Sequence, residues 1–435
     1  MKILIKNAKI IKSYNSTPFS GDILIEDDKI INISDKISID KPAKIIDATN
    51  YIAIPGFIQT HIHLAQTIFR NLAEDVPLLD WLYKYILPFE SKHNENTLYD
   101  SARLGIAELL LSGTTTIQDM ETIHFTHASF KAAEEMGIRI CMGNMLMDKG
   151  NDILSESIDF LINESESLYR EWNNYDNGRI KYVLTPRFAL SCSKDLFNKI
   201  KVMSENYDIP IHTHAAENLK ETEIVKKETG YRNIEYFEKI GIASPKLRLA
   251  HCIWLNDYEY DILIKNDIKV LHCPSTNLKL GSGIAKIPEM LDTGINVSIG
   301  ADGPPCNNNL NIFNEMKLAG LIQKLRIGAD SMPAENIFKM ATINGAKALG
   351  LEKDIGTLEK GKKADIVLLK TNIHSFDYEE KNILSTIIYS MNRDNVVYTI
   401  VDGKILVEEG KLLVAKEKEI FENAKESRLH FIQNL

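Results

Sequence analysis

Two histidines, His61 and His63, stand one residue apart at the end of the apolar stretch IPGFIQTHIHL. Because side chains at i and i+2 of a strand point to the same face, a strand here would direct both imidazoles into one space. Each ring carries polar nitrogens that need partners when they are buried, so two rings side by side are costly in a plain hydrophobic core. A metal ion would satisfy both rings, and we interpret this stretch as part of a candidate metal site.

The other ligands of such a site would have to come from distant parts of the chain. The stretch IPIHTHAAE repeats the spacing with His212 and His214, and the runs LRLAHC and NVSIGAD carry His251 and Asp302 near their ends. Imidazoles together with a carboxylate suit Zn²⁺ or Fe²⁺ and leave a coordination position for water. The sequence therefore predicts a divalent metal ion, Zn²⁺ before Fe²⁺, held without thiolates.

Eight short apolar runs position these residues, and longer amphipathic stretches separate the runs. The runs are GFIQTHIH, TTTIQDM, RICMGN, IKYVLTPR, IPIHTHAAE, LRLAHC, IKVLHCP and NVSIGAD. This alternation is typical of an α/β protein with a parallel sheet wrapped by helices, and eight units in sequence favour a (β/α)8 TIM-like barrel over residues 55–355. In such a barrel the carboxyl ends of the strands share one mouth, where active sites form.

The rest of the chain predicts helices around the barrel and a second, smaller unit. Residues 97–112, 193–206 and 257–267 are predicted helices, with Ser193 as a candidate N-cap and Gly113 as a candidate helix end. Isoleucine and leucine alternate with polar residues in residues 1–54, and a similar pattern returns after about residue 355. We predict a small β-sandwich built from both chain termini, residues 1–54 plus 356–435, with a C-terminal helix.

Composition excludes several classes of function. The chain has 435 residues and a net charge of −9, and without a dense Lys/Arg run it predicts no nucleic-acid partner and no anionic membrane partner. Its five cysteines are scattered and never form a C-x-x-C pair, which favours a reducing, cytoplasmic location over a disulfide framework. No apolar run is long enough to span a bilayer, and lysines interrupt the first residues, unlike a signal peptide. We expect a homo-oligomer whose partner is a small-molecule substrate.

Five segments together resemble the amidohydrolase superfamily: PGFIQTHIH, HTHAAEN, LAHCIWL, HCPSTNLKLGSGIA and IGADGPPCNNNLNIFNEMKLAGLIQK. More narrowly, they resemble the branch that hydrolyses cyclic amidines. That branch includes deaminases of methylthioadenosine, S-adenosylhomocysteine and 5′-deoxyadenosine, guanine deaminases and s-triazine hydrolases. The resemblance covers the whole chain and implies a metal-dependent aminohydrolase. A non-catalytic scaffold of the same fold is the alternative, and the intact set of candidate residues argues against it.

The resemblance also implies roles for individual residues. The implied metal ligands are three histidines and one aspartate: His61, His63, His214 and Asp302. In dinuclear relatives a carbamylated lysine ends strand four, whereas this chain reads VLTPRF there, so the resemblance implies one ion per subunit. His251 and Asp302 would take and hold a proton from the attacking water. Glu217 resembles the proton shuttle that protonates a ring nitrogen, and burial can raise the pKa of a carboxyl group enough for this role.

The residues matched to substrate binding do not agree on one substrate. They are Gln66, Trp81, Glu90, Arg187 and Glu217. Trp81 and Glu90 match positions that line the base pocket and bind ribose hydroxyls in adenosine-type deaminases. Gln66 and Arg187 match positions that read the ring in guanine deaminases. Guanine deamination and s-triazine hydrolysis therefore stay open beside nucleoside deamination.

One absence favours a nucleoside with an apolar 5′ group. Relatives that bind the homocysteine moiety use arginines in and after strand three, but this chain places Met145, Met147 and Lys149 there, and Arg139 lies at the start of the strand. Methionine is a soft, apolar gap filler and suits a 5′-methyl or methylthio group. We predict deamination of 5′-deoxyadenosine or methylthioadenosine, with S-adenosylhomocysteine as a further substrate, in purine salvage.

Four other polar residues near the strand ends are not assigned to the metal or to catalysis. We interpret His212 as a buried partner rather than a further ligand, and His272 as a structural residue or one that contacts a ligand. Asp119 and His124 are candidates for the rim of the pocket.

Overall fold

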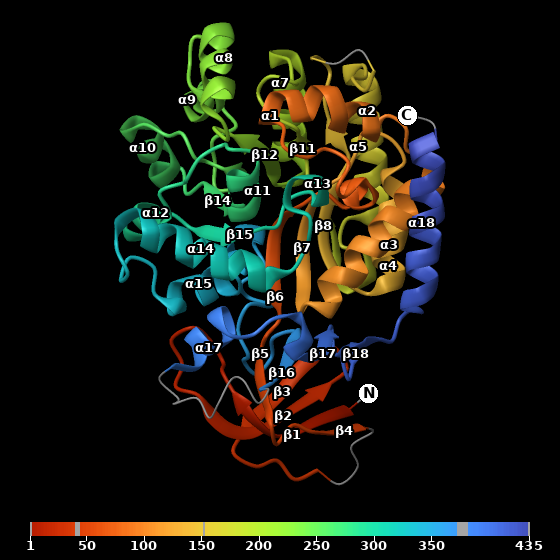
Figure 1. Ribbon diagram of the computed structural model, residues 1–435, viewed down its shortest axis with the longest axis vertical. Helices are drawn as coiled ribbons and strands as arrows, with labels where there is room; N and C mark the ends of the chain where they lie inside the picture. Colours follow the sequence, from red (N-terminus) through yellow and green to blue (C-terminus); the bar gives the residue numbers. More distant parts are fainter. Residues whose placement is uncertain (1, 40–43, 151–152, 372–381, 434–435) are drawn as a thin grey trace.

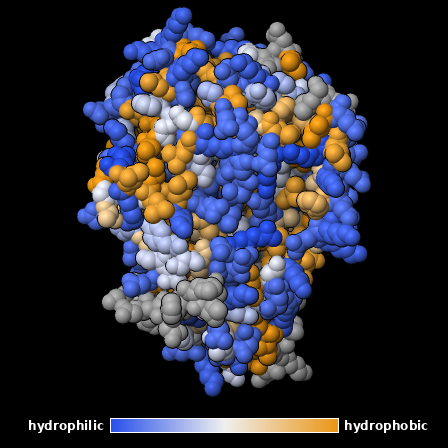
Figure 2. All heavy atoms as spheres, in the orientation of Figure 1, coloured by the Kyte–Doolittle hydropathy of each residue, from blue (hydrophilic) through white to orange (hydrophobic). Residues whose placement is uncertain are grey.

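The computed structural model describes residues 2–39, 44–150, 153–371 and 382–433. Figure 1 shows strands from both chain ends gathered at one end of the molecule, and helix-covered strands stacked above them. Figure 2 shows a largely polar face, with apolar areas on both flanks. Among the described residues, no helix is long and apolar enough to cross a membrane.

Strands from the two ends of the chain share one nine-stranded sheet. They are β1 (Lys2–Ile10), β2 (Phe19–Glu26), β3 (Lys29–Ser34), β4 (Lys44–Asp47), β5 (Tyr51–Pro55), β16 (Ile366–Lys370), β17 (Val396–Val401), β18 (Lys404–Glu408) and β19 (Lys411–Leu412). β5 pairs antiparallel with β16, with Ile54 opposite Val367. The predicted pairing of the termini is thus observed. The sandwich arrangement and the boundaries 1–54 and 356–435 stay predictions, and residues 372–381 and 434–435 of that range lie outside the described residues.

Eight parallel strands form two four-stranded sheets, and each strand matches one predicted run. The first sheet contains β6 (Phe57–Ile62), β7 (Thr114–Met120), β8 (Arg139–Gly143) and β10 (Ile180–Tyr182). The second contains β12 (Ile211–Ala215), β13 (Leu247–His251), β14 (Lys269–His272) and β15 (Val297–Ile299). Single parallel bridges join Leu184 to Ile211 and Ile62 to Asp302, and so link the two sheets at both edges. The short strands β9 (Met145–Leu146) and β11 (Thr185–Pro186) pair beyond β8 and β10.

Helices follow most of these strands. Between β7 and β15 they are α4 (Thr126–Met136), α5 (Ile158–Trp172), α6 (Tyr175–Gly178), α7 (Lys194–Tyr207), α8 (Leu219–Thr229), α9 (Asn233–Lys239), α10 (Asp257–Lys265), α11 (Pro274–Lys279) and α12 (Ile287–Asp292). The predicted helices 97–112, 193–206 and 257–267 correspond to α3 (Glu95–Leu111), α7 and α10. Ser193 caps α7 because its Oγ accepts a hydrogen bond from the Leu196 amide at 3.1 Å. Gly113, with φ of +81°, follows the end of α3, where such a backbone favours glycine.

The chain between β6 and α3 is irregular and lies at the carboxyl ends of the strands. It consists of η1 (Leu64–Phe69), α1 (Leu78–Trp81), the π-helical turn η2 (Leu82–Ile86) and α2 (Leu87–Glu90). π-Turns inside helices occur frequently at functional sites. After β15 come α13 (Pro304–Asn307), α14 (Ile312–Ile327), α15 (Ala334–Met340), α16 (Ile343–Leu349), α17 (Ile383–Tyr389), η4 (Arg393–Asn395) and α18 (Glu417–Gln433). Figure 1 shows α18 along one side of the molecule, next to α3.

Candidate metal centre and active site

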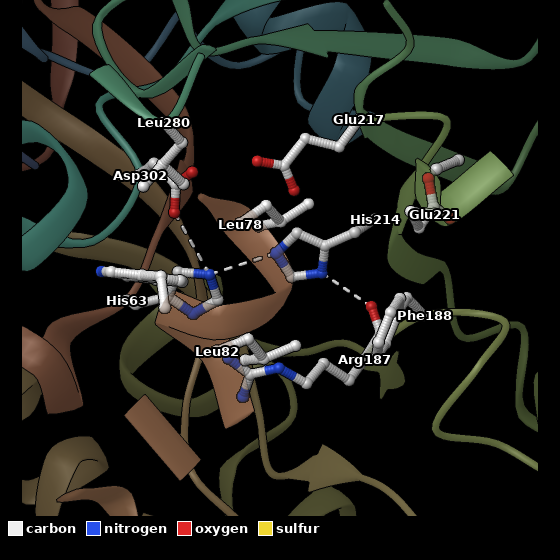
Figure 3. A pocket seen from close by; sticks show the side chains of 12 residues that line it. His63, Leu78, Leu82, Arg187, Phe188, His214, Glu217, Glu221, Leu280 and Asp302 are labelled. Atoms are coloured by element: carbon white, nitrogen blue, oxygen red, sulfur yellow. Dashed lines mark hydrogen bonds and ion pairs between the residues drawn. The ribbon is translucent and has the colours of Figure 1, made fainter. Parts of the chain in front are cut away.

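The ends of four parallel strands bring one group of polar residues together: His61, His63, His214, His251 and Asp302. The Nε2 atoms of His63 and His214 lie 3.2 Å apart. Asp302 Oδ1 lies 3.5 Å from His61 Nε2 and 3.4 Å from His63 Nε2. Figure 3 shows His63, His214 and Asp302 around one cavity. Residues far apart in the sequence thus meet within a few ångströms, as the sequence predicts.

The separations between these atoms fit a metal ion. Candidate ligand atoms of His61, His63 and His214 all lie within 4.8 Å of one another, as do those of His61, His251 and Asp302. With metal–nitrogen distances of about 2.0–2.1 Å, neighbouring ligand atoms of a tetrahedral site lie roughly 3.4 Å apart. Within the described part of the chain, the buried Nε2 of His61 has no hydrogen-bond partner. A buried ring nitrogen that faces a carboxylate and lacks a partner fits the role of a metal ligand.

The opposite ring nitrogens hold the three histidines in place. His61 Nδ1 is hydrogen-bonded to His212 Nε2 at 2.8 Å, and His63 Nδ1 donates to the Met120 carbonyl at 2.8 Å. His214 Nδ1 donates to the carbonyl of Arg187 at 2.6 Å. Such contacts fix ring orientation and leave Nε2 free for a ligand role. Burial lowers the pKa of His63 to about 3, so that its imidazole is neutral at physiological pH and its Nε2 lone pair is available.

Glu217 and His251 face each other beside this group. His251 Nε2 lies 3.5 Å from Glu217 Oε2 and 3.7 Å from Asp302 Oδ2. His251 Nδ1 donates to Asn277 Oδ1 at 2.9 Å. Because an amide oxygen only accepts hydrogen bonds, this contact places the proton on Nδ1 and leaves Nε2 free to take one. Burial raises the pKa of Glu217 to about 7, where a carboxyl group can both hold and release a proton near neutral pH.

A small cavity lies over these groups. Its polar lining consists of His63, Arg187, His214, Glu217, Glu221 and Asp302. Its apolar lining consists of Leu78, Trp81, Leu82, Phe188, Ala215 and Leu280. In Figure 3 the Glu217 carboxyl group turns toward the side of the cavity that holds His63 and Asp302.

The residues predicted to bind substrate lie in two layers. Trp81, Arg187 and Glu217 line the cavity, whereas Gln66 and Glu90 are not among its lining residues. Instead, Arg187 Nη1 lies 2.9 Å from Glu90 Oε2, and Gln66 Nε2 donates to Glu90 Oε1 at 2.8 Å. All five are buried. Gln66 and Glu90 thus lie behind Arg187 and hold its guanidinium group in this structure.

Three further polar residues near the strand ends, Asp119, His124 and His272, differ in burial and in their contacts. Asp119 is buried, and its Oδ1 accepts a hydrogen bond from the Leu64 amide at 2.7 Å, so it holds the chain directly after His63. His124 is partly exposed and lies 3.4 Å from Glu156. His272 is buried, and neither ring nitrogen has a hydrogen-bond partner among the residues that the structure describes. None of these three lines the cavity described above.

Two further residues of the site did not emerge from the sequence. Asn277 orients His251, but nothing in the run PSTNLK distinguishes it from an ordinary helix residue. Glu221 lines the cavity, is 2% exposed and accepts a hydrogen bond from Asn233 Nδ2. Burial raises the pKa of Glu221 to about 8, and the charge of Glu217 acts in the same direction. The available signal for Glu221 was its spacing, four residues after Glu217 at the start of α8.

Residues 52–406 match the amidohydrolase family. The chain is 38% identical to a 5′-deoxyadenosine deaminase of Methanothermobacter thermautotrophicus over 407 residues, which cover 93% of each chain. It is 35% identical to a 5-methylthioadenosine/S-adenosylhomocysteine deaminase of Thermoanaerobacter pseudethanolicus, with all of both chains covered. Among solved structures, an adenosine deaminase of Xanthomonas campestris with bound zinc has a TM-score of 0.91 at 24% identity. That alignment covers 99% of this chain and 98% of the other, and at this identity it reports on the fold alone.

Proposed function

Because the chain belongs to the amidohydrolase family, we propose that it is a metal-dependent deaminase of 6-aminopurine nucleosides that carry an apolar 5′ group. The products are the 6-oxo nucleoside and ammonia. The observation that carries the proposal is the pairing of Glu217 with His251. A carboxyl group with a pKa of about 7 and an imidazole with a free Nε2 lie 3.5 Å apart, beside a cluster that fits a metal ion. Hydrolytic deamination of a purine needs a proton acceptor for water and a proton donor for the ring.

The finer architecture belongs to the same proposal. We infer that the two parallel sheets close into one (β/α)8 barrel over residues 55–355, because single bridges link them at both edges. The nine-stranded sheet would fold into the β-sandwich of residues 1–54 plus 356–435. The site would then lie at the carboxyl ends of the barrel strands, where barrel enzymes place their active sites.

One divalent ion per subunit, Zn²⁺ or Fe²⁺, would be held by His61, His63, His214 and Asp302. When bound, such an ion supplies Lewis-acid activation of water. His212 and the carbonyls of Met120 and Arg187 keep the three imidazoles turned toward it. No lysine ends the fourth strand run, which supports a single ion.

The residues of the chain then move two protons. His251 Nε2 takes a proton from the attacking water, and Asp302 Oδ2, 3.7 Å away, stabilises the imidazolium that forms. Glu217 donates a proton to the ring nitrogen next to the amino-bearing carbon, which makes that carbon electrophilic. Oxygen adds to the carbon, and the proton that remains on this oxygen passes to Glu217, which restores its carboxyl group as the 6-oxo bond forms. The carbon–nitrogen bond breaks, and the proton held by His251 leaves with the amino group as ammonia.

The two cations of the strand-three region, Arg139 and Lys149, do not line the cavity, which supports an apolar 5′ group. Arg139 is paired with Asp365 and is buried at the start of β8, so it is not available to a substrate carboxylate. Lys149 Nζ already lies 3.5 Å from Glu228. A homocysteine carboxylate would have to compete with Glu228 for Lys149, whereas a methyl or methylthio group needs no cation.

Trp81 and Arg187 would enclose the base from the cavity wall. Gln66 and Glu90 lie behind Arg187 and would act on the nucleoside through it. The predicted hydrogen bonds from the ribose hydroxyls to Glu90 would require Glu90 to exchange one of its two partners, Gln66 or Arg187. Trp81, Arg187 and Glu217 would thus contact the nucleoside directly, supported by Gln66 and Glu90.

Ammonia release tests the proposal directly. The panel is 5′-deoxyadenosine, methylthioadenosine, S-adenosylhomocysteine, adenosine, guanine and melamine, with kcat/KM measured on one metal-loaded preparation. We expect 5′-deoxyadenosine and methylthioadenosine to exceed S-adenosylhomocysteine. Guanine or melamine exceeding every nucleoside by orders of magnitude would overturn the proposal.

A further inference from the structure

The C-terminal helix α18 reaches back from the terminal sheet toward the site. Figure 1 shows it beside α3, with its end near α2. Ser427 Oγ donates to Asp100 Oδ2 of α3 at 2.6 Å. Phe431, near the end of α18, is 2% exposed, whereas Phe421 on the same helix is 61% exposed. One face of α18 is therefore buried against the end of the molecule that holds the candidate site.

Phe431 lies at the centre of a buried aromatic cluster. Its ring centroid is 4.7 Å from that of Phe69, 5.5 Å from that of Phe89 and 6.4 Å from that of His93. Phe69 is the last residue of η1, and Phe89 lies in α2. Aromatic pairs at these separations attract each other beyond the area that they bury. Phe69 and Phe89 also contact each other, with ring centroids 5.5 Å apart, and Phe431 packs against both rings.

Hydrogen bonds fix η1 from both sides. Arg428 Nη1 donates to the carbonyls of Ile68 at 2.6 Å and Arg70 at 2.7 Å. His93 Nε2 donates to the Ala65 carbonyl at 2.8 Å. Carbonyls at the end of a short helix lack hydrogen-bond donors within the helix. Arg428 of α18 supplies a donor to the carbonyls of Ile68 and Arg70.

Glu90 and Arg187 connect η1 and α2 to the cavity. Gln66 belongs to η1, and Glu90 directly follows Phe89 in α2. Gln66 Nε2 and Arg187 Nη1 hydrogen-bond to the two carboxyl oxygens of Glu90, and Arg187 lines the cavity. A shift of η1 relative to α2 would break the hydrogen bond between Gln66 and Glu90. Glu90 would then hold Arg187 less firmly.

We propose that α18, through Phe431 and Arg428, is a positioning element for substrate recognition. It holds Gln66 and Glu90 in register, and Glu90 in turn holds Arg187 against the cavity. The inference rests on the proposed function where it names the nucleoside as the ligand affected. The contacts described here include neither the candidate metal ligands nor Glu217, so the effect falls on substrate affinity rather than on proton transfer.

The first test compares Phe431→Ala with the matched control Phe421→Ala on the same helix. We expect Phe431→Ala to raise KM for 5′-deoxyadenosine about 3- to 10-fold, the span that corresponds to loss of one or more aromatic pairs, with kcat within about 2-fold and metal content unchanged. Phe431→Leu keeps most of the volume, should fold even if the alanine variant does not, and should restore part of the affinity. Phe421→Ala should match the parent. An unchanged KM in both Phe431 variants would overturn the inference.

A double-mutant cycle tests the route through Glu90. If Phe431 acts by positioning Glu90, then Phe431→Ala added to Glu90→Gln should raise KM little further, because residues that act through each other do not add. A merely structural role for Phe431 predicts independent, multiplying effects on KM. That second result would overturn the route.

Amide hydrogen exchange gives a readout that needs no substrate. Phe431→Ala, but not Phe421→Ala, should raise exchange in residues 64–70 and 87–93 of the metal-loaded protein. Unchanged exchange there would overturn the positioning role even if the kinetics differed. Raised exchange in a protein that deaminates no nucleoside would instead refute the proposed function and leave the positioning role supported.

Discussion

Glu217 and His251 differ in the hydrogen bonds that hold them, and this difference assigns them different roles in proton transfer. His251 is fixed by Asn277 at 2.9 Å, whereas Glu217 Oε1 accepts a longer hydrogen bond, 3.5 Å, from Ser282 Oγ. Glu217 therefore keeps a carboxyl group that is weakly held, buried and able to exchange its proton. A well-paired carboxylate would stay ionised and could not donate.

Glu217→Gln should abolish most of the activity without removing the metal. Because a positioned acid–base group contributes typically about 10²–10⁴-fold, we expect kcat to fall by that factor, with metal content per chain unchanged. Steady-state kinetics and elemental analysis of the same preparation check both parts. Glu223→Gln, an exposed position on α8 six residues further along the chain, is the control and should match the parent. Turnover near that of the parent in Glu217→Gln would refute the assigned role.

His61→Ala should remove both metal and activity, because His61 is buried among the other candidate ligands. We expect metal content to fall from about one ion per chain toward zero, since loss of one ligand of a four-ligand site weakens binding strongly. His124→Ala removes a partly exposed histidine outside the cavity and should keep the ion. About two ions per active parent chain would contradict the single-ion proposal.

Glu221 should make the free energy of unfolding depend on pH. Burial raises the pKa of Glu221 to about 8 from an ordinary value near 4.5, so the folded chain holds this proton where the unfolded chain has lost it. The stability that this group contributes is fully present below the unfolded pKa and is lost as pH rises through the folded pKa. Glu221→Gln cannot ionise and should escape this loss.

We therefore expect the variant to gain stability relative to the parent as pH rises from about 5 to about 8, by at most about 1.4 kcal/mol per pH unit. Urea unfolding at several pH values checks this. A difference between the two proteins that is constant across this range would show that Glu221 is ionised in the folded chain.

The sequence alone predicts the histidines and the aspartate of the candidate site, but not the residues that orient them. The i, i+2 histidines and the polar strand ends could be predicted because a strand has period two and parallel strands end at one edge. Asn277 could not, because its role arises only when the end of β14 comes beside β13. Likewise, no spacing indicates that Glu90 lies behind Arg187, 97 residues further along the chain.

At the scale of elements, the eight parallel strands were predictable because strands buried on both faces read as continuous apolar runs. The helix starting after Ser193 was predictable because a serine before an amphipathic stretch is a frequent cap. The segment of η1, α1, η2 and α2 was not. Its short turns follow no single period, and its shape depends on Phe69 and Phe89 packing against α18, which follows more than 300 residues later.

The same segment shows how an irregular element becomes part of a site. α1 and η2 contribute Leu78, Trp81 and Leu82 to the cavity, and α2 contributes Glu90 behind it. Residues 78–90 form one helical run that contains the π-turn, and the Phe69 and Phe89 side chains of the segment pack against α18. This packing is why we expect α18 to influence recognition rather than chemistry.

At the scale of the molecule, one buried ion cluster joins the parallel strands to the terminal sheet. Arg139, at the start of β8, donates to Asp365 through Nε at 2.8 Å and Nη2 at 3.0 Å. Its Nη2 also donates to Asp402. All three residues are buried, and the Asp402 amide donates to Asp365 Oδ1 at 2.9 Å. The partners lie 226 and 263 residues from Arg139 in the sequence, so no local pattern could predict this junction.

Arg139→Met should destabilise the whole chain while leaving the chemistry of the folded fraction intact. Removing the arginine leaves the buried carboxylate of Asp365 without this cation and leaves Asp402 with Lys363, whose Nζ lies 3.5 Å away. Breaking a buried pair costs about 3–5 kcal/mol. Arg139 lies at the amino end of β8, opposite the candidate site, so kcat per folded, metal-loaded molecule should stay within about 2-fold of the parent. Denaturant unfolding followed by circular dichroism measures the stability, and ammonia release measures kcat.

Arg170→Met is the matched control, because the side chain of Arg170 is 72% exposed and pairs with Glu166 across one helical turn, a contact worth about 0.3–0.5 kcal/mol. Adding Asp365→Asn and Asp402→Asn to Arg139→Met should recover part of the loss, since neutral amides no longer repel each other. A loss below about 1 kcal/mol in Arg139→Met would show that water or another cation compensates the two carboxylates. A large drop in kcat at full folding would instead show that the junction with the terminal sheet shapes the distant end of the strands.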